Sequence, residues 1–457
     1  MGGASVHGRD KRFQGLRRCL SRSCPALVPR CPDGRRCQRQ RPLNATLYLA
    51  PPSLYSHHRP ERKGEIDSQA QSTSVVTYYQ HLHHLRQRSA FHPSSRAINL
   101  GSKYHDMTIG ELLHYSFLRV VAGSFSGLQT GHTIVGSLFG IVETSVPDEV
   151  ISVPGKAGRS VAVHVYLNDA AKKAKAEGRP CVTYITLHGT AHFHAHPKYL
   201  LALVGGGFVL KRHGRDAGFI NHLLQSPVLE PVPLIILDSD YPHAPEYPFP
   251  AAIEDISSLV AHVQAHPDLY DPAKLLIGGF SAGANIALGV TTLLGEDAIR
   301  ANKPHPLQGV VAFYPPVDLA NRHTNPESVR PAHPIPGAVL PKRMGDFFTA
   351  CYFSYSPDPD ADKRKPAASP SFADAGTFPA KVLLITCEHD TLRVASEEFR
   401  AKLKTGGGGK IDVRGRVVEG VGHGWDCMIK KEGDPGWKER VETYDEAAQL
   451  VHDVATS

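Results

Sequence analysis

The chain has 457 residues, a length that suits one large domain with appended segments, and 41% of the residues are hydrophobic, as in an ordinary globular protein. The formal net charge of +7 comes from the first 100 residues, which hold 17 of the 51 Lys and Arg but only five of the 44 Asp and Glu. The rest of the chain has a net charge of −5, which argues against a surface that tracks nucleic-acid phosphates.

Residues 1–100 show no sustained periodicity and are dominated by Arg, Ser, His and Gln, which predicts a basic, disordered N-terminal tail. The four cysteines of this tail lack the paired Cys-x-x-Cys spacing of a zinc site. No apolar run has the form of a secretory signal or the length of a membrane span, so we expect a cytoplasmic protein. A mitochondrial transit peptide is the alternative, because the tail is rich in Arg and Ser and poor in acid.

Ordered structure is expected to begin near Thr108, because residues 108–111 (Thr-Ile-Gly-Glu) have the form of a helix capping box. The apolar residues that follow fall roughly on one helical face, and this pattern predicts a helix that could cover the core. They are Leu112, Leu113, Phe117, Val120 and Val121.

From about Glu149, short apolar runs alternate with helix-like stretches. The runs span residues 161–167, 182–187, 234–238, 275–278, 309–314, 382–386 and 413–418, and the helix-like stretches include 251–265 and 284–294. Several runs are apolar on both faces, as central parallel strands must be. The alternation predicts an α/β fold with a mostly parallel sheet flanked by helices, whose active site lies beyond the carboxyl ends of the strands.

One of these strand ends carries a nucleophile motif. The run 275–278 leads into residues 279–283, Gly-Phe-Ser-Ala-Gly, and then into a helix-like stretch. A sharp strand-to-helix turn strains the backbone of Ser281 and lifts its hydroxyl above the sheet, and the glycines let neighbouring chains approach closely. We therefore predict that Ser281 is a nucleophile, with an ordinary glycine-rich turn as the alternative interpretation.

In a fold of this kind the acid and then the histidine follow the nucleophile along the chain. The strand predicted at 382–386 is followed by Glu388 and Asp390, and the one predicted at 413–418 is followed by His423 between two glycines. We predict that His423 accepts the serine proton and that Asp390 fixes the imidazole tautomer. Glu388 is the local alternative for the acid.

Residues 240–252 (Asp-Tyr-Pro-His-Ala-Pro-Glu-Tyr-Pro-Phe-Pro-Ala-Ala) resemble the segment Asp-Tyr-Arg-Leu-Ala-Pro-Glu-His-Pro-Phe-Pro-Ala-Ala of the hormone-sensitive-lipase family of α/β-hydrolases. This family includes microbial carboxylesterases and arylacetamide deacetylases. Residues 279–285 are similar to the family's Gly-Asp-Ser-Ala-Gly-Gly-Asn, with Phe280 in place of Asp and Ala284 in place of Gly. Residues 314–318 and 368–370 also fit, and the resemblance covers roughly residues 105–450.

The resemblance implies an α/β-hydrolase fold with a helical cap. It also implies a serine esterase that forms an acyl-enzyme and needs no cofactor or metal. We expect a catalytic domain over residues 101–457, with cap elements at about 105–145 and 319–368. Phe347, Phe348, Tyr352 and Phe353 either line the acyl pocket or form the core of this cap.

The family also carries His-Gly-Gly-Gly-Phe after an early strand, and glycine N–H groups of this motif bind the oxyanion together with the residue after the nucleophile. Here His188 and Gly189 are separated from Gly206, Gly207 and Phe208 by sixteen residues, 190–205. The expected oxyanion hole comprises Gly189, Gly206, Gly207 and Ala282.

The inserted segment 190–205 is either a retained intron in the gene model or a genuine insertion that remodels the oxyanion hole. Its alternating histidines, His192, His194 and His196, suggest a metal site as a third interpretation, but no cluster of carboxylates accompanies them. The expected partner is a small-molecule ester with a small or medium acyl group. A non-catalytic small-molecule-binding protein on the same fold is the alternative function, and an amidase or lactonase is another.

Overall fold

The computed structural model describes residues 109–138, 145–189, 207–210, 216–321, 329–429 and 431–457, all within one unit, residues 95–457. Several predicted features lie outside the described residues: the N-terminal tail, Thr108 of the capping box, parts of both cap regions, the segment 190–205 with its three histidines, and Gly206. No helix among the described residues combines the length and the apolar character that crossing a bilayer requires.

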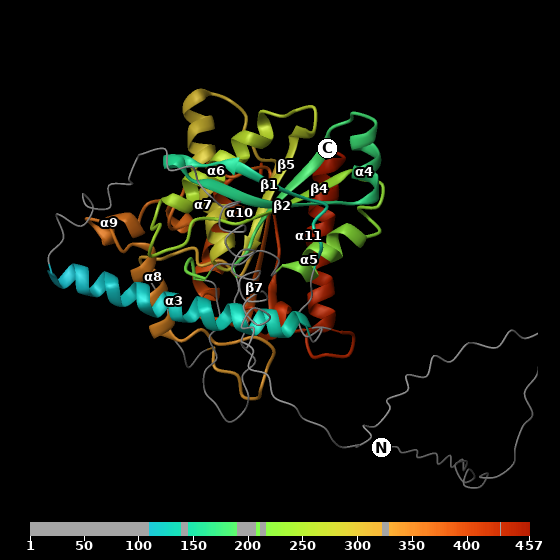
Figure 1. Cartoon of the computed structure of the whole chain (residues 1–457). Helices are drawn as coiled ribbons and strands as arrows, with labels where there is room; N and C mark the ends of the chain where they lie inside the picture. Colours follow the sequence, from blue (N-terminus) through green and yellow to red (C-terminus); the bar gives the residue numbers. More distant parts are fainter. Residues whose placement is uncertain (1–108, 139–144, 190–206, 211–215, 322–328, 430) are drawn as a thin grey trace, which may run out of the picture. The chain divides into compact units, whose positions relative to one another are not determined.

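Among the described residues, nine strands form one sheet (Figure 1). Their order is β1 (Glu149–Pro154), β2 (Ser160–Leu167), β4 (Leu234–Ser239), β3 (Cys181–Leu187), β5 (Tyr270–Phe280), β6 (Gly309–Phe313), β7 (Lys381–His389) and β8 (Asp412–Arg414), and β9 (Val417–Gly422) also pairs with β7. The two pairs that involve β2 are antiparallel, and the other pairs are parallel. The prediction of a mostly parallel α/β sheet is therefore confirmed.

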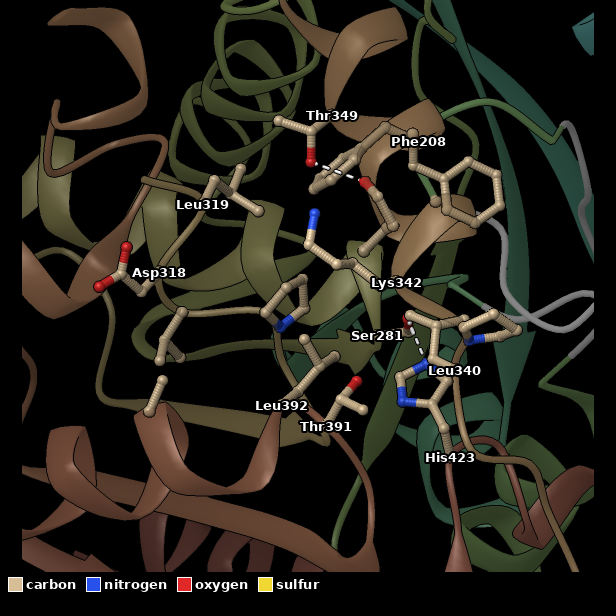
Figure 2. A pocket seen from close by; sticks show the side chains of 18 of the residues that line it. Phe208, Ser281, Asp318, Leu319, Leu340, Lys342, Thr349, Thr391, Leu392 and His423 are labelled. Carbon is tan, nitrogen blue, oxygen red and sulfur yellow. Dashed lines mark hydrogen bonds between the residues drawn. The ribbon is translucent and has the colours of Figure 1, made fainter. Parts of the chain in front are cut away.

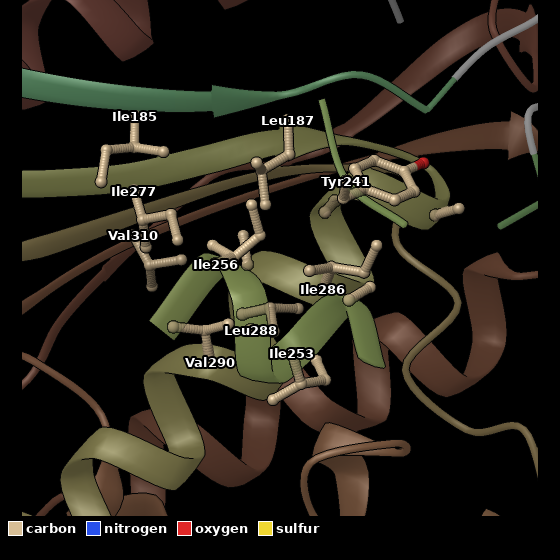
Figure 3. Packing of buried hydrophobic residues seen from close by; sticks show 14 of the residues in the cluster. Ile185, Leu187, Tyr241, Ile253, Ile256, Ile277, Ile286, Leu288, Val290 and Val310 are labelled. Carbon is tan, nitrogen blue, oxygen red and sulfur yellow. The ribbon is translucent and has the colours of Figure 1, made fainter. Parts of the chain in front are cut away.

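The central strands bury both of their faces because side chains alternate between two hydrophobic cores. In β3, Tyr184 enters one core, and Ile185 and Leu187 enter the other. Helices α4 (Asp169–Ala176), α6 (Ala251–Gln264), α7 (Ala282–Ala301) and α10 (Arg393–Gly406) close one core, where Ile256 of α6 and Ile286 of α7 pack against the strands (Figure 3). Helices α5 (Ala217–Gln225) and α11 (Trp437–Ala455) close the other.

The single strand predicted over residues 413–418 is wrong, because the chain forms β8 and β9 there instead. The break falls at Gly415, whose φ of +107° is rarely adopted by residues with a side chain. A Cβ atom at this position would lie 2.0 Å from the carbonyl oxygen of Leu384 on β7. The break divides the pairing with β7 between β8 and β9, and β9 then leads to His423.

The apolar face predicted for the first helix, α3 (Ile109–Leu138), is also wrong. Leu113, Phe117 and Val120 are more than 60% exposed, whereas Tyr115, Leu118 and Ala122 are buried. The buried face is selected by tertiary contacts that apolar periodicity does not register. The ring of Tyr115 lies 4.6 Å from that of Tyr355, and the Arg119 guanidinium lies 3.3 Å from the Glu246 carboxylate.

The region predicted as the second cap element contains α8 (Lys342–Tyr352) and α9 (Pro359–Lys363). Its aromatic residues take both of the roles that were expected. Phe348, Tyr352 and Phe353 are all buried in the hydrophobic core, and Phe348 also lines a pocket. The Tyr352 ring stacks on Phe208 at 3.9 Å. Phe347 is partly buried against the same core.

Candidate active site

Ser281 stands at the sharp turn between β5 and α7, with φ and ψ of 50° and −118°. Its backbone N–H donates to the carbonyl oxygen of Phe313 at 2.9 Å, which anchors the turn to the end of β6. The glycines of the motif allow the turn to press against β3. A Cβ atom on Gly279 or Gly283 would lie 2.4 Å or 2.1 Å from the carbonyl oxygen of Leu187. This strained, closely packed turn is the local structure that the motif predicts.

A hydrogen-bonded chain joins Ser281, His423 and Asp390 (Figure 2 shows the first two). The Ser281 Oγ lies 2.8 Å from the His423 Nε2, and the His423 Nδ1 lies 2.7 Å from the Asp390 Oδ2. All three residues are at most 5% exposed. The structure therefore brings together the three residues that the sequence predicts as nucleophile, base and acid, from the ends of three different strands.

Backbone contacts fix both partners of this serine. The chain at His423 pairs with Ala338, exchanging N–H···O bonds of 2.7 Å and 3.0 Å in the two directions. The Asp390 Oδ1 accepts the backbone N–H of Leu392 at 3.0 Å, which leaves Oδ2 directed at the imidazole. The position of the ring is thus set by the surrounding chain as well as by its own hydrogen bonds.

Tyr314 supports the same ring and was missed by the sequence reasoning. Its ring meets the His423 imidazole edge-on at 4.8 Å, and its hydroxyl donates to the Asp426 carboxylate at 2.6 Å. Tyr444 donates to the other oxygen of Asp426 at 2.8 Å. Burial, followed by the charge of Asp426, raises the pKa of the Tyr314 phenol well above its usual value, so the hydroxyl stays protonated as a donor.

Glu388, the alternative acid, has a different environment from Asp390. Its Oε2 accepts the backbone N–H of Gly420 at 2.8 Å, and its side chain is 41% exposed. The Nδ1–H of the neighbouring His389 donates to the carbonyl oxygen of Val329, 2.9 Å away. Geometry thus favours Asp390 over Glu388 as the partner of His423.

Of the four residues predicted for the oxyanion hole, Gly189 and Ala282 lie at the serine turn and Gly207 lines the same pocket as Ser281. Gly189 packs so closely that a Cβ atom there would lie 1.4 Å from the Phe280 carbonyl oxygen and 3.1 Å from the Ala282 nitrogen. Gly207, with φ of +53°, lines the same pocket as Ser281 and Ala282. Gly206 lies outside the described residues. Gly189 thus packs on the turn itself, and Gly207 lies in the wall of the pocket that contains Ser281, although the insertion separates the two glycines in sequence.

A pocket of about 760 Å³, part of it open to solvent, leads to Ser281 and His423 (Figure 2). Its walls are mostly apolar and include Phe208, Leu319, Leu340, Phe348 and Leu392. Strained backbone borders it: of the five non-glycine residues with positive φ in the described chain, Phe208, Ser281 and Tyr314 lie at or beside this site. Such strain gathers at binding and catalytic sites, where the surrounding structure enforces it.

Comparison with known proteins identifies sequence relatives. Residues 200–426 match the model of a family described as alpha/beta hydrolase fold. The chain is 32% identical over 185 residues to the carboxylic ester hydrolase LipN of Mycobacterium tuberculosis, a match that covers 39% of this chain and 46% of LipN. It is 28% identical over 256 residues to the AB hydrolase superfamily protein C1039.03 of Schizosaccharomyces pombe, covering 53% and 68% of the two chains. The chain thus spans less than half the length of LipN.

The fold of this chain is also similar to those of solved esterase structures. The hyperthermophilic esterase of the archaeon Pyrobaculum calidifontis matches with a TM-score of 0.55 and 24% identity, over 74% of this chain and 94% of the esterase. The thermostable carboxylesterase EstE1, cloned from a metagenomic library, matches with a TM-score of 0.54 and 24% identity, over 74% and 97% of the two chains. At this level of identity the likeness shows a common fold.

Proposed function

We propose that this chain, which belongs to the alpha/beta hydrolase fold family through its residues 200–426, is a serine hydrolase that cleaves carboxylic esters. The observation that carries the proposal is the hydrogen-bonded chain from Ser281 through His423 to Asp390 at the base of an apolar pocket. The relatives named as esterases support the same reaction class.

In the proposed reaction the Ser281 Oγ attacks the acyl carbon while the His423 Nε2 accepts the hydroxyl proton. The ester C–O bond then breaks, and His423 returns the proton to the leaving alcohol. Water next attacks the acyl-enzyme, with His423 again as the base, and the carboxylic acid leaves. Asp390 accepts a hydrogen bond from the Nδ1–H throughout and stabilises the imidazolium that forms in each step.

Backbone N–H groups near the serine would bind the developing oxyanion. Ala282 stands at the N-terminus of α7, where the free N–H groups and the helix dipole favour negative charge. Gly189 and Gly207 are the further donors we propose, and Gly206 is the expected fourth residue. Small size at these positions matters because any side chain on Gly189 would collide with the turn.

The aromatic wall of the pocket is proposed to limit the length of the acyl group. Phe348 lines the pocket, and its ring lies over Gly207. Phe348→Ala is expected to shift the preference from acetyl towards hexanoyl esters by roughly tenfold, because burying about two of the extra methylenes contributes about 0.8 kcal/mol each. The measurement is the ratio of kcat/KM for p-nitrophenyl hexanoate and acetate. Phe347→Ala is the matched control on the same helix, and an equal shift in both variants would contradict the assignment of Phe348.

The insertion is expected to be dispensable. Because Gly189 packs on the serine turn and Gly207 lines the pocket that contains Ser281, we expect a chain that joins Gly189 directly to Gly206 to keep both glycines at the site. Deletion of residues 190–205 should therefore leave kcat/KM on p-nitrophenyl butyrate at least as high as in the full chain. Higher activity would favour the retained-intron interpretation. A large loss in a folded deletion variant would mean that the insertion is a working part of the site.

A further inference from the structure

A second group of polar side chains lies at the same edge of the sheet as Ser281. His188 follows β3, Asp240 follows β4, and His243 stands three residues later. Since β3 and β4 are adjacent and parallel, their carboxyl ends meet at one edge. His188 and His243 are 1% and 3% exposed, whereas the Asp240 side chain is 33% exposed, so the group is buried with one side open to solvent.

The two imidazoles face the same carboxylate oxygen. The Asp240 Oδ1 lies 3.2 Å from the His188 Nε2 and 3.7 Å from the His243 Nε2, and the three possible ligand atoms all lie within 4.8 Å of one another. The distance to His243 is longer than a hydrogen bond. Ligands held about 2.0–2.1 Å from a tetrahedral zinc ion are separated from one another by roughly 3.3 Å. The His188 Nε2 makes a hydrogen bond to this oxygen, and the separations of 3.2 Å and 3.7 Å bracket the edge of a tetrahedral site.

We propose that His188, Asp240 and His243 bind a divalent transition metal, with Zn²⁺ as the best match. Two imidazoles and one carboxylate form a donor set that suits zinc, and water from the open side next to Asp240 would complete a tetrahedral shell. The sequence resemblance gives no expectation of this site, because the family segment has Leu where this chain has His243.

Tyr241 and the neighbouring strand hold the ligands in place. The Tyr241 hydroxyl donates to the carbonyl oxygen of His188 at 2.9 Å, and the backbone N–H of Asp240 donates to Ala162 on β2 at 3.0 Å. The Tyr241 ring also stacks on both imidazoles with centroids 4.7 Å apart. A ligand set fixed in this way loses little conformational entropy when a metal binds.

The proposed metal would connect two walls of the candidate active site. His188 precedes Gly189, and the backbone N–H of Ala244, next to His243, donates to the carbonyl oxygen of Phe208 in the pocket wall at 2.9 Å. The proposal assigns the metal no part in the acyl transfer, because Ser281, His423 and Asp390 supply its nucleophile, base and acid. Its effect is to stabilise the loop after β4 against the end of β3, and this site goes beyond the proposed esterase function.

The test compares zinc binding by the full chain with that of His243→Leu, the residue found in the family segment. The sequence holds 26 histidines, so the readout is the difference in stoichiometry between two variants and not the total. Wild type should bind one more Zn²⁺ per chain by calorimetry than His243→Leu. Excess Zn²⁺ should also raise the thermal unfolding temperature of wild type by several degrees more, because a ligand that binds the native state stabilises it.

A matched control addresses adventitious binding. His262 and His266 form a histidine pair on the surface near the end of α6, with ring centroids 4.2 Å apart, and such a pair can bind zinc by itself. The His262→Ala/His266→Ala variant should keep the zinc-dependent stabilisation that His243→Leu loses. Co²⁺ provides a geometric probe, because the visible absorption of tetrahedral Co²⁺ should be present in wild type and the control but absent from His243→Leu.

Two results would overturn the proposal. One is equal stoichiometry and stabilisation in wild type and His243→Leu, and the other is loss of binding only in the His262→Ala/His266→Ala control. His243→Gln, which keeps a polar side chain of similar size, replaces the leucine variant if circular dichroism shows that the latter is unfolded. The same two outcomes then apply to it.

Discussion

Ser281→Ala is expected to reduce kcat for ester hydrolysis by on the order of 10⁶-fold, the loss typical when the nucleophile of a serine triad is removed. The hydroxyl oxygen is the attacking atom, and no other group can replace it at the turn. The fold should persist, because alanine keeps the Cβ atom in the same strained backbone and the hydroxyl makes one hydrogen bond, to His423. A lost hydrogen bond of this kind costs about 1 kcal/mol.

The measurement is the hydrolysis of p-nitrophenyl butyrate together with the thermal unfolding temperature of each protein. Thr391→Val is the matched control, since it removes another hydroxyl that lines the pocket and should change kcat less than tenfold. Ester hydrolysis by a pure, folded Ser281→Ala protein at the wild-type rate would refute the assignment of the nucleophile.

Asp390→Asn should lower kcat by about 10⁴-fold, the size of effect seen when the carboxylate of a serine triad becomes an amide. The Asp390 Oδ2 accepts a hydrogen bond from the Nδ1–H of His423 at 2.7 Å, which leaves the Nε2 lone pair free to accept the proton of the serine. An amide NH₂ facing Nδ1 instead favours the tautomer that carries its proton on Nε2. The imidazole then has no lone pair directed at the serine, although the site keeps its shape.

Glu388→Gln provides the comparison for this variant. Glu388 accepts a hydrogen bond from the backbone of Gly420 and is partly exposed, so its neutralisation should change kcat less than tenfold. Steady-state kinetics of the two variants on one substrate give the ranking directly. If Glu388→Gln loses more activity than Asp390→Asn, the assignment of the acid to Asp390 is wrong.

The parts of the fold that could be predicted from sequence are those encoded by local pattern. The strand that leads into Ser281 is followed by the glycines that its sharp turn requires. The two apolar strands before Asp390 and His423 indicate where the acid and the base follow along the chain. Parallel strands then place all three at one sheet edge, so a one-dimensional order was sufficient to predict a three-dimensional cluster.

Other features depend on contacts that local pattern does not encode. The buried face of α3 is selected by Tyr115 and Ala122, whose neighbours come from distant segments, and the larger apolar residues at Leu113 and Phe117 remain exposed. Tyr314 and Asp426, which support His423, are 112 residues apart in sequence. Their motif context gives no sign of the partnership, although an aromatic residue directly after a buried strand end was a signal that could have drawn attention to Tyr314.

The grouping of His188 with Asp240 and His243 also depends on contacts that local pattern does not encode. Asp240 and His243 belong to the segment 240–252 and His188 to the oxyanion motif, so no single sequence motif joins the three residues. Only the pairing of β3 with β4 places them within ligand distance. The insertion after Gly189 separates the two halves of the oxyanion motif in sequence, so local pattern alone could not establish where Gly207 lies relative to Ser281.

The central claim is that Ser281 forms a covalent acyl-enzyme, and reaction with a fluorophosphonate tests it most directly. This reagent phosphonylates a serine only where a base and an oxyanion site activate the hydroxyl. Intact mass spectrometry of the full chain, followed by peptide mapping, should show one adduct on the peptide that contains Ser281, and no adduct in Ser281→Ala. A folded wild-type protein that remains unlabelled, or that is labelled at another residue, would contradict the proposed serine hydrolase and would favour a non-catalytic binding protein on the same fold.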